Sequence, residues 1–114
     1  MPVDVYDLTA VLARLQAQAR AEAIEFTLHA QQEMMEEAIS PEDVLHAMAT
    51  GQILENYPAH RRGSCCLLHG QALDGRNLHL VCTTARAALL LITAYEPRPP
   101  KWVTPTQRRP RGDL

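Results

Sequence analysis

The sequence predicts an α+β domain in which three N-terminal helices pack on one face of a four-stranded antiparallel meander sheet. The hydrophobic period changes after Gly51, from the spacing of helices to the alternation of strands. Asp74-Gly75 lies between two apolar runs and is a strong hairpin signal. Prolines and basic residues then fill the C-terminal end, which cannot continue as helix or strand for long. We therefore assign residues 1–97 to one domain and residues 98–114 to an extended basic tail.

Three segments carry helix start signals followed by an apolar stripe. The strongest is Ser40-Pro41, because a serine can cap the helix and a proline at the first helical position has no N–H to satisfy. Two acids follow directly, at the positive end of the helix dipole. The three predicted helices cover residues 8–23, 29–38 and 41–49, after the caps Asp7, Thr27 and Ser40.

The second half reads as four strands joined by short loops, which favours antiparallel pairing in chain order. A two-residue turn at Asp74-Gly75 would place His69 opposite Leu80 and turn His79 to the other face. The helices can cover one face, and the other is left for the first helix, the tail with Trp102, or a second copy in a homodimer. The predicted strands are residues 52–57, 64–70, 77–84 and 88–96, with residues 24–26 as a short extended link.

Charge is unevenly distributed along the 114 residues, although the net charge is only −2. Residues 1–57 hold ten acids and two arginines, and residues 58–114 hold three acids and nine basic residues. This pattern fits either two solvated faces or a basic surface that binds an anion such as RNA. Three cysteines indicate no disulfide framework, and no secretory signal or membrane span is visible, so we expect a cytoplasmic protein without a membrane partner.

His29 is the first candidate for chemistry. It lies at the start of a predicted helix, where the dipole disfavours imidazolium, so we expect a neutral ring that can accept a proton. The alternative is a hydrogen-bonded histidine that orders the helix start. A metal site is not expected, because no C-x-x-C or H-x-x-x-H spacing exists, and no cofactor is expected. The cysteines and histidines of the predicted strands are Cys65, Cys66, Cys82, His69 and His79.

Arginines near strand ends could converge on a phosphate, and an aromatic side chain could stack a base. The same residues could form a solvated rim instead. Tyr95 could also carry a proton, so we group it with His29 as a candidate catalytic residue. The candidate nucleic-acid-binding residues are Arg61, Arg62, Arg76, Arg98, Lys101 and Trp102, with Arg86 nearby.

Several short segments agree, in order, with the pattern of one protein family. The agreement covers about residues 26–102 and omits the first helix and most of the tail. Its segments are His29-Ala30, Met34, Ile39-Ser40-Pro41-Glu42-Asp43-Val44, Gly51 with Ile53, Tyr57-Pro58, Gly63-Ser64-Cys65, Arg76–His79, Thr93-Ala94-Tyr95-Glu96-Pro97 and Trp102.

This pattern resembles an uncharacterised bacterial family, the domain of unknown function numbered four-two-five-eight. The resemblance implies a small cytoplasmic protein, similar to the ribonuclease toxins of toxin–antitoxin pairs and encoded beside a small antitoxin. The family tends to carry arginines where this chain has Glu33 and Glu37, and an acid where it has Arg98. Such a change would weaken a phosphate site on the helix.

We therefore expect a toxin-like module that binds or cleaves RNA without a metal. His29 would act as general base or structural cap, with Arg61, Arg62 and Arg76 as phosphate contacts. A non-catalytic interaction module, forming a homodimer or binding an antitoxin-type partner, is the alternative. An inactive family member is the third reading.

Overall fold

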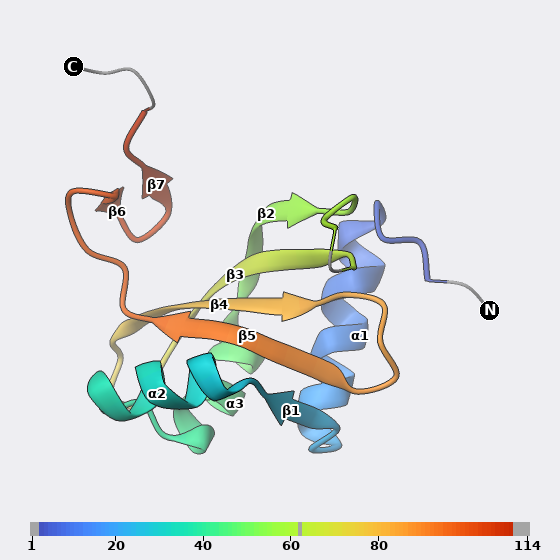
Figure 1. Ribbon diagram of the computed structural model, residues 1–114, viewed down its shortest axis with the longest axis horizontal. Helices are drawn as coiled ribbons and strands as arrows, with labels where there is room; N and C mark the ends of the chain where they lie inside the picture. Colours follow the sequence, from blue (N-terminus) through green and yellow to red (C-terminus); the bar gives the residue numbers. More distant parts are fainter. Residues whose placement is uncertain (1–2, 62, 111–114) are drawn as a thin grey trace.

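The computed structural model describes residues 3–61 and 63–110, which fold into a five-stranded mixed sheet, three helices and a separate two-stranded sheet (Figure 1). The large sheet has the strand order β1-β5-β4-β3-β2. Its helices are α1 (Leu8–Arg20), α2 (Leu28–Glu36) and α3 (Pro41–Thr50), and its strands are β1 (Ile24–Phe26), β2 (Gln52–Tyr57), β3 (Cys65–Gln71), β4 (Asn77–Thr83) and β5 (Leu89–Tyr95). The small sheet consists of β6 (Trp102–Thr104) and β7 (Gln107–Arg108).

The prediction of a four-stranded antiparallel meander is wrong in two places. First, the expected link at 24–26 is the strand β1, which pairs in parallel with the start of β5. Three residues are too few to show a strand period, and a parallel partner is distant in the chain. Second, the tail is not fully extended, because β6 and β7 form an antiparallel hairpin. The four predicted strands pair antiparallel in chain order, as expected.

The three predicted helices are confirmed, and each begins at its predicted cap. The side chains of Asp7, Thr27 and Ser40 each accept the backbone N–H of the residue three positions later. The first helix ends at Arg20, earlier than predicted, because the chain turns at Glu22 with a positive φ of 55°. None of the described helices is long and apolar enough to cross a membrane.

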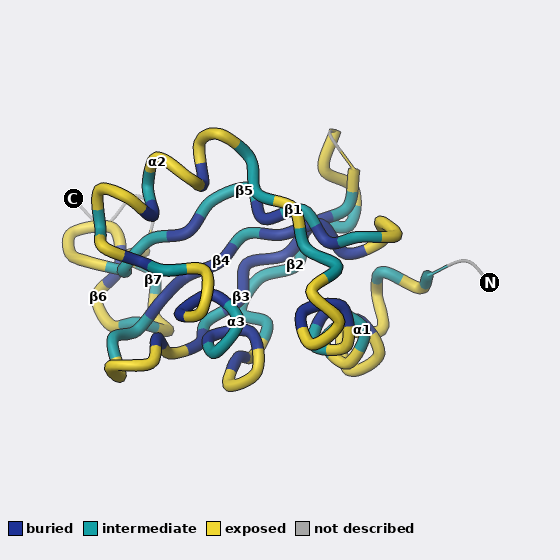
Figure 2. Tube along the Cα trace, turned by 90° about the horizontal axis from the view of Figure 1, so that it is seen from below, coloured by how far each residue is buried: buried dark blue, intermediate teal, exposed yellow. Residues whose placement is uncertain are grey.

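The main core lies between the sheet and the helices. Leu68, Leu80 and Cys82 are fully buried in it, together with residues of all three helices. Figure 2 shows α2 beside β5, near one edge of the sheet, whereas α3 packs on β3 and α1 packs on α3. The approach of α3 to β3 is so close that a Cβ atom at Gly70 would lie 1.9 Å from the Ala47 carbonyl oxygen. Only glycine fits there.

The register of β3 and β4 differs by one residue from the prediction. His69 lies opposite His79, and Leu68 lies opposite Leu80. The connection is longer than two residues, because the backbone N–H of Ala72 donates to the carbonyl of Arg76. Opposed residues share a face of the sheet, so both histidines point away from the main core. Trp102, which is 2% exposed, covers His79 on that face, so the tail supplies one of the three expected coverings.

Candidate functional site

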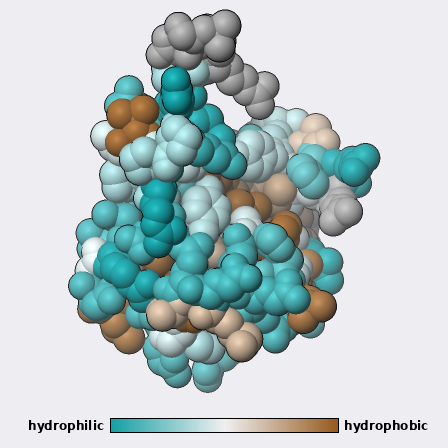
Figure 3. All heavy atoms as spheres, turned by 60° about the vertical axis from the view of Figure 1, so that its left-hand side comes forward, coloured by the Kyte–Doolittle hydropathy of each residue, from teal (hydrophilic) through white to brown (hydrophobic). Residues whose placement is uncertain are grey.

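A cleft of about 550 Å³ lies on the face of the sheet that α1 and α3 leave uncovered. A smaller hollow of about 250 Å³ adjoins it, because both are lined by Val81 and Ile92. Figure 3 shows hydrophobic atoms in a hollow beneath the mainly hydrophilic tail end of the molecule. The cleft is lined by His29 and Glu33 of α2, Tyr57 of β2, Leu67 of β3, Val81 of β4, Ile92, Thr93 and Tyr95 of β5, and Lys101 and Arg108 of the tail.

His29 stands on the rim of the cleft, at the second residue of α2. Its side chain is 66% exposed, and its Nε2 atom lies 3.2 Å from Oε1 of Glu33, one helical turn further on. Glu33 is anchored on β5, since its Oε1 also accepts the backbone N–H of Ala94 at 3.1 Å and the hydroxyl of Thr93. His29 therefore lies next to a carboxylate, that of Glu33, which is held in place by hydrogen bonds to β5.

Tyr95 lies deeper in the cleft and is hydrogen-bonded to the buried His79. The Nε2 atom of His79 donates to the carbonyl of Pro105, so in the neutral ring Nδ1 accepts the hydroxyl proton of Tyr95 at 3.1 Å. Burial lowers the pKa of His79 and raises the pKa of Tyr95, which favours this neutral arrangement. Tyr95 thus offers its oxygen lone pairs to the cleft, while its proton is engaged by His79.

Arg108 also lines the cleft, and it is held by Glu55 of β2. Its guanidinium donates to both carboxylate oxygens of Glu55, at 3.0 and 2.8 Å, and stacks 4.6 Å from the centre of the Trp102 ring. The Tyr57 hydroxyl donates to the same carboxylate. Hydrogen bonds from Arg108 hold the pKa of Glu55 below its ordinary value. The pKa of Tyr57 is raised, mainly by burial and to a smaller extent by the hydrogen bond to Glu55. The Arg108 charge is therefore compensated inside the protein.

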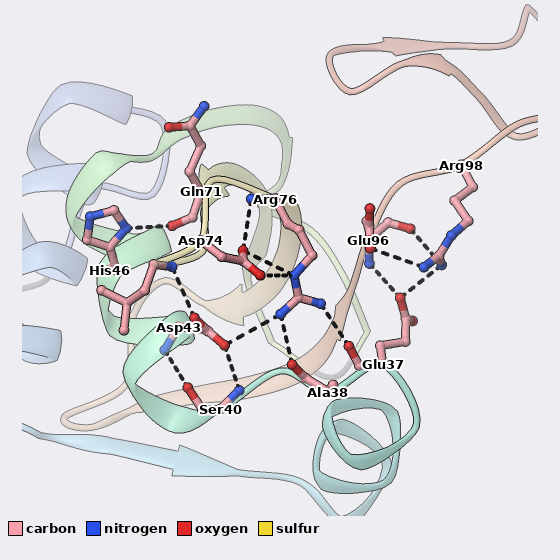
Figure 4. A network of polar contacts seen from close by, with 11 residues as sticks. Glu37, Ala38, Ser40, Asp43, His46, Gln71, Asp74, Arg76, Glu96 and Arg98 are labelled. Atoms are coloured by element: carbon pink, nitrogen blue, oxygen red, sulfur yellow. Dashed lines mark hydrogen bonds and ion pairs between the residues drawn. The ribbon is translucent and has the colours of Figure 1, made fainter.

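Arg76 is placed away from the cleft, in a structural network (Figure 4). It donates to the carbonyls of Glu37 and Ala38 at 2.8 Å and to the carboxylate of Asp74 at 2.9 Å. Its Nη2 also lies 3.6 Å from Oδ2 of Asp43. The hydrogen bond from the backbone of Ser40 is the main cause that lowers the pKa of Asp43. Arg76 joins the α2–α3 connection to the β3–β4 turn, and its charge is paired with Asp74 and Asp43.

Arg98 is also paired inside the protein. Its guanidinium lies 2.9 Å from Oε1 of Glu37 and 3.1 Å from Oε2 of Glu96 (Figure 4). Glu37 additionally accepts the backbone N–H of Glu96. Positions 37 and 98, where the resemblance implied the opposite charges, thus form one ion pair with each other in this chain.

The remaining predicted residues divide into three groups. Lys101 lines the cleft and Arg61 lines the adjoining hollow, and neither forms an ion pair with any described residue. Trp102 is buried against His79 and Arg108, so its ring is occupied. Arg62 lies outside the described residues. Within residues 3–61 and 63–110, no group of three or more His, Cys, Asp or Glu side chains could hold a metal ion.

Sequence reasoning missed Glu33, Tyr57, His79 and Arg108 as residues of this site. The spacing of His29 and Glu33, four residues apart on a helix, was a visible signal for a contact. The positions of Tyr57 and His79 depend on the β2–β3 and β3–β4 pairings, and that of Arg108 depends on the hairpin of the tail. No local pattern predicted the hairpin.

Comparison with known proteins gives one match. The model of the family described as Domain of unknown function (DUF4258) matches residues 26–96. No curated protein and no solved structure matches the chain. The matched segment contains His29, Glu33 and Tyr95, whereas Lys101 and Arg108 lie beyond it.

Proposed function

The chain belongs to the family described as Domain of unknown function (DUF4258), and we propose a function for the cleft, because the matched residues 26–96 include most of the residues that line it. The protein binds single-stranded RNA there and cleaves it without a metal, as a toxin-like ribonuclease. One observation carries the proposal. The same cleft holds an exposed histidine beside a carboxylate and a lysine that no acidic side chain of the described chain neutralises.

Binding would depend on the two uncompensated cations. Lys101 lines the cleft, and Arg61 lines the hollow that continues from it across Val81 and Ile92. Two cations along one trough can hold the phosphates of a flexible single strand. The ring of Tyr57 or Tyr95 can stack a base in the same space.

The chemistry would begin at the ribose. His29 removes the proton of the 2′-hydroxyl, and the electron pair of that oxygen forms a new bond to the adjacent phosphorus. The bond from phosphorus to the 5′ oxygen breaks, and the 5′ oxygen leaves with its electron pair and takes a proton from water. Lys101 stabilises the negative charge that develops on the phosphate oxygens. The products are a 2′,3′-cyclic phosphate end and a 5′-hydroxyl end.

The test is incubation of the purified chain with a single-stranded RNA and with the same strand carrying 2′-deoxyribose throughout. We expect cleavage of the RNA alone, unaffected by EDTA. His29→Ala should reduce the rate at least about a hundredfold, the usual contribution of a general base. His46→Ala is the matched control, since His46 lies on α3 and its Nδ1 contacts the Gln71 carbonyl outside the cleft.

Three results would contradict the proposal. They are cleavage of the deoxyribose strand, loss of activity with EDTA, and full activity of His29→Ala. Binding with no cleavage by the parent chain would instead identify an inactive member that retains the RNA site.

A second function, protein interaction, is favoured by a separate observation on α2. Leu28 and Met35 lie seven residues apart on one side of this helix and are 70% and 84% exposed. We propose that this stripe docks a second copy of the chain, as an apolar stripe on a helix favours association. Light scattering should give a dimer mass, and Leu28→Ser with Met35→Ser should return the monomer. A monomer mass for the parent at high concentration contradicts the dimer and leaves an antitoxin-type partner as the other occupant.

A further inference from the structure

Three neighbouring groups hold Glu33 through a single carboxylate oxygen, two of them by hydrogen bonds and one by an ion-pair contact. Its Oε1 atom lies 3.2 Å from His29 Nε2 and 3.1 Å from the Ala94 backbone nitrogen, and it accepts the Thr93 hydroxyl. Its side chain is only 20% exposed, against 66% for His29. The carboxylate is thus anchored on β5, whereas the imidazole has no other anchor than the carboxylate among the described residues.

The fixed position follows from the edge of the sheet. β1 pairs with β5 only as far as Leu91, so the backbone N–H groups further along this edge need other partners. α2 runs beside that part of β5, and Glu33 accepts the N–H of Ala94. The hydrogen bonds to β5 would hold the carboxylate even if the histidine were absent.

We propose that Glu33 is the positioning residue of His29, an inference that rests on the proposed RNA cleavage. Glu33 accepts the Nε2 proton of the ring and so fixes both the tautomer and the direction of the imidazole. Nδ1, which makes no hydrogen bond with any described residue, is then the atom that takes the 2′-hydroxyl proton. The imidazolium formed in that step lies beside the carboxylate, which stabilises it.

This role reverses the expectation drawn from the family pattern. An acid at position 33 was expected to weaken a phosphate site on α2. In this proposal the cation that binds the phosphate is Lys101 of the tail. Position 33 on α2 can therefore hold an acid that orients His29. The acid therefore contributes to the chemistry and not to phosphate binding.

Glu37 provides a matched control for a purely structural role. It is the C-cap residue of α2, its carboxylate accepts the backbone N–H of Glu96, directly after β5, at 2.9 Å, and it pairs with Arg98. It has no contact with a histidine. If Glu33 acted only on the sheet edge, variants at positions 33 and 37 would behave alike.

The test measures the order of the His29 ring by ¹³C relaxation of its C–H groups, in the parent, in Glu33→Ala and in Glu37→Ala. The positioning role predicts that the ring gains mobility in Glu33→Ala and keeps its order in Glu37→Ala. RNA cleavage by Glu33→Ala should fall about a hundredfold in kcat at unchanged KM, the cost of a small misplacement of a catalytic group. Glu33→Gln is the second variant, because its amide oxygen can still accept the Ala94 N–H if the alanine variant fails to fold.

Equal ring order in the parent and in the position-33 variant overturns the proposal, whether or not RNA is cleaved. An equal loss of kcat in the position-37 variant also overturns it, because the effect would then belong to the sheet edge. If the parent does not cleave RNA, the proposed function fails, while the ring measurement still decides whether Glu33 orders His29.

Discussion

The two faces of the sheet are built from different kinds of side chain. On the helix-covered face, β3 and β4 contribute Cys66, Leu68, Leu80 and Cys82, all fully buried in the main core. On the other face the same strands contribute Leu67, Val81 and the histidines at positions 69 and 79, and the tail hairpin covers only part of them. The first face supplies stability, and the second keeps polar groups next to a cleft. Variants at neighbouring positions of one strand can separate the two roles.

The largest difference should appear between Leu80 and Val81. Leu80 is fully buried, so Leu80→Ala should lower the free energy of unfolding by about 3 kcal/mol through lost burial and a residual cavity. Val81 is only partly buried on the floor of the cleft, and Val81→Ala should cost about 1 kcal/mol. Urea unfolding followed by circular dichroism measures both. Equal costs would mean that the cleft face is packed as tightly as the core.

Trp102→Ala tests how strongly the hairpin is attached. We expect a loss of about 2 kcal/mol, below the usual cost of truncating a buried aromatic side chain, because the hairpin can detach while the sheet remains folded. Hydrogen exchange should then accelerate in β6 and β7 and leave β3 and β4 protected. Loss of protection throughout the sheet would show that the hairpin belongs to the same cooperative unit.

Acid should destabilise the cleft face through His79. Burial lowers its pKa, so below 6.5, its ordinary value, the unfolded chain binds a proton that the folded chain resists. The free energy of unfolding should therefore fall as the pH drops from 6.5, and this slope should flatten in His79→Gln. Glu55 and Asp43, whose pKa values are also lowered, add a further loss below about pH 4.5. Urea titrations between pH 4 and 8 give the profile, with His46→Gln as the control that keeps the slope.

The smallest effect is expected for a single cation of the cleft. If Lys101 contacts one phosphate, Lys101→Gln should reduce the slope of log affinity against log salt by roughly 0.7, the value for a single strand. Arg20→Gln, at the exposed end of α1, removes an equal charge outside the cleft and should leave the slope unchanged. Fluorescence anisotropy with a labelled RNA at several salt concentrations measures both. An equal change in the two variants would indicate general attraction by net charge.

Local signals predicted the helices and most of the strands. The caps at Asp7, Thr27 and Ser40 are contained within four consecutive residues each, so no distant partner was needed to find them. β1 was missed because its pairing depends on Leu89–Leu91, far along the chain. The predicted register between β3 and β4 was wrong because Asp74-Gly75 was taken as the whole turn, whereas the connection starts at Ala72.

The site was harder to predict than the fold. His29 and Tyr95 both line one cleft, but a list of arginines does not reveal which of them already has a partner. Arg76 is held by backbone carbonyls and acids, and Arg98 by Glu37, through contacts that span about forty to sixty residues of sequence. Such pairings appear only when the tertiary structure is known. Whether these residues carry RNA chemistry remains a prediction.

The parallel pairing of β1 with β5 also affects how the chain folds. Ile24 must find Leu89, sixty-five positions later, whereas the β3–β4 hairpin closes through a connection of a few residues. Closing a long loop costs more conformational entropy, so the hairpins should form first and β1, with α2, should dock late. His29 arrives with that docking, whereas Arg108 is synthesised seventy-nine residues after His29. A nascent chain would therefore carry no complete cleft until residue 108 has left the ribosome, so the site could not act before that point.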